Sequence, residues 1–203
     1  MKIGVVDYDA GNLTSVITAL EHLNADYICS KIPEELERAD KIIFPGVGEA
    51  DQAMNSLKRY NLDEFLKDYS KKGNCLLGIC LGYQILLAHS EESNTDCLGL
   101  VPGKVKRFPD TIDLKIPHMG WNTIEVLREN VLFTDIPADC SFYFVHSYFA
   151  DLINTEYALT ATDYGIHFSS GIINSNIAAF QFHPEKSGRF GLKLLENFIN
   201  RFG

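Results

Sequence analysis

Hydrophobic positions in residues 1–90 follow two alternating spacings. Nearly continuous apolar runs predict buried strands, which we place at 2–7, 26–30, 41–44 and 74–79. Between them, apolar residues recur every three or four positions and predict helices, which we place at 12–23, after Pro33, at 50–57 and at 62–69. Strands that alternate with helices indicate a parallel, doubly wound sheet, whose ligands bind beyond the carboxyl ends of the strands.

The second half of the chain is dominated by strand-like patterns. We place these strands at 105–108, 121–126, 142–145, 157–162, 166–172 and 177–182. A last helix is expected at 190–202. Turn residues at 163–165 and 174–176 favour hairpins, so these strands predict an antiparallel extension of the same sheet. No linker or repeat interrupts the pattern, and we expect one α/β domain over residues 1–203.

Composition and charge exclude several classes of function. The 203 residues carry a formal net charge of −9 without clusters of Lys or Arg, which disfavours binding to nucleic acid or to anionic membranes. The five cysteines are scattered and never spaced as Cys-x-x-Cys, which argues against a disulfide framework and a zinc site. No signal peptide or membrane-spanning run is recognised, so we expect a cytoplasmic protein. We also expect no metal or other cofactor.

Cys80 is the candidate nucleophile. It follows a predicted buried strand and lies between Gly78 and Gly82. A helical pattern follows it through Ile85, Leu86 and Leu87, and His89 also has helical spacing. Gly-x-Cys-x-Gly is the nucleophile-elbow pattern with sulfur in place of oxygen, in which glycines permit a sharp turn that presents the central side chain. The N-terminus of the following helix would favour a thiolate. The alternative is a buried structural thiol, which is the commoner fate of a free cysteine.

His183 and Glu185 are the candidate base and its orienting carboxylate. They end the predicted strand 177–182, with Pro184 between them. A histidine activates a thiol and protonates a leaving amine, while a carboxylate fixes its tautomer. The alternative is a surface histidine beside a solvated turn. Earlier in the chain, Gly46-Val47-Gly48 could turn backbone N–H groups towards an oxyanion, although an ordinary turn would have the same sequence.

Together these three motifs, Pro-Gly-Val-Gly, Gly-Ile-Cys-Leu-Gly-x-Gln and Phe-His-Pro-Glu, resemble the class I, triad-type glutamine amidotransferases. Further stretches resemble the glutaminase subunits of imidazole glycerol phosphate synthase within that family. These stretches are Asp7-Tyr8 with Gly11-Asn12-Leu13, the run 117–122, the run 143–148 and the run 181–187. The resemblance implies a flavodoxin-like fold and hydrolysis of L-glutamine to glutamate and ammonia.

The same resemblance implies roles for individual residues. Cys80, His183 and Glu185 would form the catalytic triad, and Val47, Gly48 and Leu81 the oxyanion hole. Gln84, Glu92, Ser147 and Tyr148 would hold the substrate, and Trp121, Tyr143 and Lys186 would face a partner. The implied partner is a (β/α)8-barrel cyclase, which would receive ammonia and make imidazole glycerol phosphate in histidine biosynthesis.

Other interpretations differ in specific residues. Asp9-Ala10, Tyr83 and Glu49 depart from the usual pattern, which leaves open a paralogue that supplies ammonia to another acceptor, such as a surface-polysaccharide sugar. The amidotransferase domain of anthranilate synthase would share the triad without His-Met-Gly-Trp-Asn. A DJ-1-like protein or another cysteine hydrolase would lack His-Pro-Glu at this position. A catalytically inactive binding subunit would be expected to have lost a triad residue.

Overall fold

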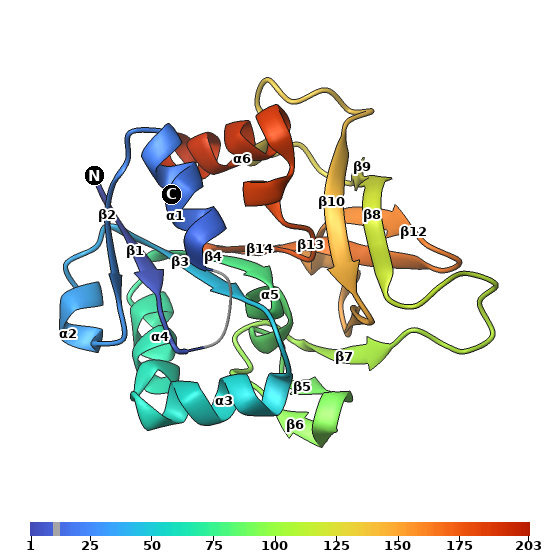
Figure 1. Cartoon of the computed structure of the whole chain (residues 1–203), viewed down its shortest axis with the longest axis horizontal. Coiled ribbons are helices and arrows are strands. Elements are labelled where there is room, and N and C mark those ends of the chain that lie inside the picture. Colours follow the sequence, from blue (N-terminus) through green and yellow to red (C-terminus); the bar gives the residue numbers. More distant parts are fainter. Residues whose placement is uncertain (10–12) are drawn as a thin grey trace.

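Cys80 ends a central strand of a large sheet, in the half where neighbouring strands run parallel (Figure 1). In spatial order this half contains β2 (Asp26–Ser30), β1 (Lys2–Val6), β3 (Lys41–Gly46), β4 (Cys75–Cys80) and β14 (Ile177–Phe180). The computed structural model describes residues 1–9 and 13–203. The first residue of the predicted helix 12–23 and the Gly11-Asn12 pair therefore lie outside the described residues.

Helices cover both faces of the parallel half (Figure 1). One side carries α1 (Leu13–His22) and α6 (Gly188–Arg201). The other side carries α2 (Pro33–Leu36), α3 (Ala50–Arg59), α4 (Leu62–Lys71) and the short α5 (Leu81–Ile85). Because each face packs on a hydrophobic cluster, strands such as β4 are buried along their whole length, which explains their continuous apolar sequence.

Mainly antiparallel strands extend the sheet beyond β14. They are β13 (His167–Asn174), β11 (Tyr148–Leu152) and β7 (Gly103–Arg107), followed by β5 (His89–Ser90) and β6 (Thr95–Asp96), while β12 (Ala158–Asp163) pairs with β13 and with β9 (Glu125–Val126). Among the described residues of this extension, only β5 pairs in parallel, with β7. Short 3₁₀ turns complete the chain at η1 (Glu92–Asn94), η2 (Val131–Phe133), η3 (Thr155–Tyr157) and η4 (Pro184–Lys186). The predicted α/β fold, mostly parallel with an antiparallel extension, is confirmed.

Two predicted strands do not join this sheet. β8 (His118–Thr123) and β10 (Ser141–His146) pair with each other and form a separate ribbon beside it (Figure 1). The inner face of the ribbon packs Phe142 and Phe144 into the core, whereas Met119 and Trp121 on the outer face are 62% and 60% exposed. The expectation that all C-terminal strands extend one sheet is therefore wrong for this pair.

Two boundaries also differ from the sequence prediction. The helix after Cys80 ends at Ile85, because the following residues turn back to bond with the 97–101 segment. His89, which has helical spacing, instead lies in strand β5, paired with Asp96. Strand β11 was not predicted at all, since its mixed sequence lacks a clear apolar alternation.

Lys41 is a buried lysine that ties β3 to the end of α6. Its ammonium donates hydrogen bonds to the carbonyls of Phe198 (3.0 Å), Ile199 (2.9 Å) and Phe202. The last carbonyls of a helix have no partner within the helix, and the negative end of its dipole favours a cation there. Burial lowers the pKa of Lys41, so these carbonyls compensate a charge that burial disfavours.

We expect Lys41→Met to lower stability by about 2–3 kcal/mol, since buried carbonyls would lose their donor. For a chain of this size that corresponds to a fall in melting temperature of roughly 5–10 °C. Thermal denaturation followed by circular dichroism measures it. Lys72→Met, at an exposed position after α4, is the matched control and should change the melting temperature little. Equal melting temperatures for the two variants would contradict the role given to Lys41.

Candidate active site

The backbone at Cys80 adopts a strained turn between β4 and α5. Its φ is +56°, a value that residues with a Cβ rarely adopt. The flanking glycines are required by close packing: a Cβ on Gly82 would overlap the carbonyl of Phe44, and one on Gly78 would lie 2.7 Å from Leu86. The turn therefore has the form of a nucleophile elbow, with the sulfur at the carboxyl end of the strand.

His183 and Glu185 form a buried pair next to this turn. The Nδ1 of His183 lies 2.7 Å from Oε1 of Glu185, and the side chains are 2% and 3% exposed. Glu185 lies in the turn η4, not in extended backbone, and Pro184 begins that turn. The carboxylate accepts the Nδ1 proton, which leaves Nε2 of His183 as the second reactive nitrogen.

Cys80 acts directly on the charge state of His183. Burial opposes the imidazolium, but the Cys80 sulfur and the Glu185 carboxylate outweigh it and raise the pKa of His183 to about 10. The Nε2 of His183 is buried and has no hydrogen bond of good geometry within the described residues. In sites without substrate, catalytic hydrogen bonds are often long or poorly aligned, so this arrangement suits a thiolate–imidazolium pair.

A cleft of about 310 Å³ opens in front of the sulfur, a volume within the range of small-molecule sites. The residues expected to form the oxyanion hole and to hold substrate all line it, together with Cys80. They are Val47, Gly48, Leu81, Gln84, Glu92, Ser147 and Tyr148. These side chains come from four separate segments of the chain, which the fold brings to one edge of the parallel strands.

Polar groups of the cleft are fixed by further contacts. The Nε2 of Gln84 donates to the carbonyl of Tyr148 (3.1 Å), and Oε2 of Glu92 accepts from the backbone N–H of Ala50 (2.9 Å). Burial raises the pKa of Glu92, and the bond from Ala50 opposes that effect. Gly48, which lines the cleft, has φ +104°, and nothing lies within 4 Å of the position of a Cβ.

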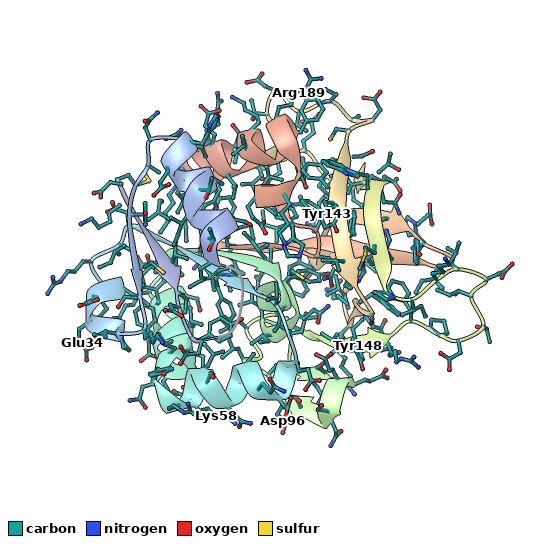
Figure 2. All side chains as sticks on the ribbon, in the orientation of Figure 1. Glu34, Lys58, Asp96, Tyr143, Tyr148 and Arg189 are labelled. Atoms are coloured by element: carbon teal, nitrogen blue, oxygen red, sulfur yellow. The ribbon has the colours of Figure 1, made fainter. Side chains whose placement is uncertain are left out.

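The residues expected to face a partner lie on the outside of the ribbon and beside it. Trp121 and Tyr143 are cross-strand neighbours with ring centroids 6.2 Å apart, and Lys186 is half-buried in η4. Figure 2 shows Tyr143 on β10, below α6. The backbone of Tyr143 also accepts a hydrogen bond from the N–H of His183 (2.9 Å). A single backbone hydrogen bond thus connects the ribbon to the candidate base.

Comparison with known proteins identifies the family. The family description "Glutamine amidotransferase class-I" matches residues 4–202. The chain belongs to the class-I glutamine amidotransferases. It is 44% identical to "Imidazole glycerol phosphate synthase subunit HisH" of Methanosarcina barkeri, over 98% of each chain. It is also 44% identical to the protein of the same name from Neisseria meningitidis, over 98% of this chain and 100% of the relative. The resemblance seen in the sequence is confirmed.

Solved structures agree on the fold of this amidotransferase. "Structure of PurLQS from Thermotoga maritima" matches with a TM-score of 0.78 at 17% identity, over 100% of this chain and 99% of that one. A structure described as "Crystal structure of glutamine amidotransferase" matches with a TM-score of 0.75 at 19% identity, over 97% and 96%. Over the described ranges, no helix is long and apolar enough to cross a membrane, and no three His, Cys, Asp or Glu residues are grouped to hold a metal ion.

The amidotransferase site contains a glutamine that the sequence analysis did not single out. The Nε2 of Gln181 lies 3.8 Å from the sulfur of Cys80, and its Oε1 accepts from Gln84 (2.8 Å). Gln181 precedes His183 by two residues, just beyond the end of β14. That spacing was the available signal, because alternate residues of an extended segment point to one side.

Two further histidines of the amidotransferase form a pair beside the cleft, and one of them, His146, lines it. Nδ1 of His118 lies 2.9 Å from Nε2 of His146, and both residues are buried. Burial lowers the pKa of His118 to about 4 and that of His146 to about 3, where the charge of His183 adds to the effect. Unlike His183, neither ring has a carboxylate partner, so both are neutral near pH 7.

This pair makes stability depend on pH. In the unfolded chain both histidines take up protons near pH 6.5, whereas in the folded chain they resist protonation until about pH 4 and 3. The unfolded state therefore binds more protons below pH 6.5, and stability falls as the pH falls, by at most about 1.4 kcal/mol per pH unit for each histidine.

We expect the urea midpoint of the wild-type chain to decrease between pH 7.5 and 5.5. In His118→Phe the decrease should be smaller, because one of the two titrating rings is gone while its aromatic neighbours remain. Parallel urea titrations at several pH values measure both slopes. His183, whose pKa is raised, gives a slope of opposite sign above about pH 6.5, because there only the folded state holds its proton. This slope is common to both proteins, so it does not affect their comparison. Identical slopes in the two proteins would contradict the assignment.

Proposed function

We propose that this chain, as one amidotransferase domain over residues 1–203, hydrolyses L-glutamine and supplies the ammonia to a cyclase subunit of imidazole glycerol phosphate synthase. The observation that carries this proposal is the strained Cys80 turn facing the buried His183–Glu185 pair. The 44% identity to HisH proteins supports this acceptor over a polysaccharide sugar. The reaction would serve histidine biosynthesis in the cytoplasm and needs no cofactor from this subunit.

The first half of the reaction forms a thioester. The Cys80 thiolate attacks the side-chain amide carbon of glutamine, and the carbonyl oxygen becomes an oxyanion held by backbone N–H groups of the Val47–Gly48 segment and Leu81. The His183 imidazolium then gives its Nε2 proton to the amide nitrogen. The carbon–nitrogen bond breaks, ammonia leaves, and a glutamyl thioester to Cys80 remains.

The second half releases glutamate. Neutral His183 takes a proton from a water molecule, whose oxygen attacks the thioester carbon, and the carbon–sulfur bond breaks to restore the thiolate. Glu185 holds Nδ1 of His183 protonated through both halves, so that Nε2 faces the reacting atoms. Gln84, Glu92 and the Ser147–Tyr148 backbone hold the amino-acid head of glutamine at the other end of the cleft.

The outer face of the ribbon is the proposed site of the partner. Met119 and Trp121 expose large apolar side chains there, and an aromatic anchor is characteristic of an interface hot spot. Tyr143 and Lys186 each share a backbone hydrogen bond with His183. A cyclase barrel seated on this face would cover the His183 end of the site, so ammonia could pass without entering bulk solvent.

We expect Cys80→Ala to abolish glutamine-dependent synthesis by the complex while ammonia-dependent synthesis stays at the wild-type rate. The sulfur is needed only to release ammonia, so supplying ammonia should bypass it. Product formation from each nitrogen source is measured with the purified complex. Cys29→Ala, on the edge strand β2, is the matched control and should retain both activities. Loss of both activities in Cys80→Ala would point to a structural role for Cys80.

We expect Glu185→Gln to lower kcat for glutamine hydrolysis by roughly 10²- to 10⁴-fold, with a smaller effect on KM. A neutral amide no longer stabilises the imidazolium and can hold the wrong tautomer of His183. Steady-state release of glutamate measures this. Glu34→Gln, an exposed position on α2 labelled in Figure 2, should retain wild-type kinetics. A Glu185→Gln variant within threefold of the wild-type kcat would remove Glu185 from the mechanism.

A further inference from the structure

The buried histidine pair connects the ribbon to the cleft through an unbroken set of hydrogen bonds. Nδ1 of His146 lies 2.7 Å from the carbonyl of Tyr148, and Nε2 of His146 lies 2.9 Å from Nδ1 of His118. Nε2 of His118 lies 3.3 Å from Nδ2 of Asn122 on the same strand. The three side chains come from β8 and β10, and the set ends on a backbone carbonyl that borders the cleft.

The chemistry of the two ends fixes every proton in this set. A carbonyl can only accept, so Nδ1 of His146 carries a hydrogen and its Nε2 is an acceptor. His118 must then donate from Nδ1, and its own Nε2 accepts from Asn122. Asn122 is oriented in turn, because its Oδ1 accepts from the N–H of Thr123 (2.8 Å) and its Nδ2 also donates to the carbonyl of Asp163 (3.0 Å). Both histidines are therefore Nδ1–H tautomers.

Packing holds the two rings in this orientation. The ring of His118 stacks between Tyr164 and Phe144, at centroid distances of 3.9 and 4.7 Å and an interplanar angle of 21° in each case. His146 packs against Phe108 and Phe168. Both rings are buried, and this aromatic surround offers no other polar partner, which favours the hydrogen bonds within the set.

The carbonyl at the end of the set occupies a corner of the chain. β10 ends at His146 in the ribbon, and β11 begins at Tyr148 in the large sheet, so Ser147 bridges two sheets. Figure 2 shows Tyr148 at the lower end of β10. The same carbonyl also accepts from Gln84, which bonds to Gln181 beside the Cys80 sulfur. The Tyr148 carbonyl is thus held both by His146 of the ribbon and by Gln84 on the side of the nucleophile.

We propose that His118 and His146 are positioning residues, whose hydrogen bonds from the ribbon fix the Ser147–Tyr148 backbone for binding of the amino-acid head of glutamine. The proposal rests on the proposed function, which assigns glutamine to this cleft. It also gives the ribbon a second route to the site, separate from the bond between Tyr143 and His183. A shift of β8 on partner binding would move Asn122 and His118 together, and would reach the substrate through Tyr148.

The tautomers can be tested without any activity. Long-range ¹H–¹⁵N NMR spectra of the full chain labelled with [¹⁵N]histidine distinguish Nδ1–H, Nε2–H and charged rings. Signals are assigned by their loss in His118→Asn and His146→Asn. We expect both rings to be Nδ1–H and neutral at pH 7, although Nε2–H is the commoner form in water. An Nε2–H or a charged ring at either position would overturn the proposal.

The effect on substrate can be tested with a matched pair of variants in the complex with the cyclase. His118→Phe keeps the stacking but removes the donor to His146, and we expect the KM for L-glutamine to rise about tenfold with a smaller change in kcat. His118→Asn keeps an N–H at the Nδ1 position and should restore KM to within about threefold of wild type. Ammonia-dependent synthesis should be unchanged in both variants.

The outcomes separate this proposal from the proposed function. A wild-type complex that does not hydrolyse glutamine would refute the function, while the NMR result would still decide the hydrogen-bond assignment. An active wild type with an unchanged KM in His118→Phe, or no recovery in His118→Asn, would overturn the positioning role. If melting curves show that His118→Phe does not fold, His146→Leu and His146→Asn provide the same comparison at the second ring.

Discussion

The site depends on the close contact between the Cys80 turn and strand β3. Gly46 pairs in register with Cys80, and α5 begins so near β3 that no side chain fits at Gly82. A positive φ at a residue with a Cβ costs of the order of 1–3 kcal/mol, and it persists only where the surrounding packing leaves no alternative. Here β4 is buried on both sides, and all residues of α5 are buried. The hydrophobic core therefore supplies the free energy that holds the sulfur at the sheet edge.

The same contact explains why residues from distant segments meet. The turn after β3 contributes Val47 and Gly48, and the turn after β4 contributes Cys80 and Leu81. β14 pairs with β4 and delivers Gln181 and His183 just beyond its end. The carboxyl ends of parallel strands share one edge, so three consecutive neighbours in the sheet bring the proposed oxyanion hole, nucleophile and base together. The helices and core on either face keep these ends in register.

Much of this arrangement was predictable from the sequence, because the signals were local. Continuous apolar runs marked the buried strands, and Gly78 and Gly82 marked the turn at Cys80. The spacing of His183 and Glu185 indicated their contact, although the backbone there is a 3₁₀ turn. The separate ribbon was not predictable, since an alternating strand pattern does not show which sheet a strand joins. Long-range pairing of polar groups was equally unpredictable from the sequence. His118 and His146 are separated by 28 residues, and only tertiary packing determines which partner a buried polar group meets.

The histidines near the cleft show that burial alone does not decide charge. Burial disfavours the charged form of both His146 and His183. The pKa of His146 is lowered to about 3, whereas the pKa of His183 is raised to about 10. The difference lies in the partners: His183 faces a carboxylate and a sulfur that can carry negative charge, whereas His146 contacts a carbonyl and another neutral ring. Groups whose surroundings separate their pKa values in this way take different roles in one site. A second cation beside His183 would weaken the proposed pair of His183 with Cys80, so the neutral state of His146 favours the charge that the proposed mechanism requires on His183.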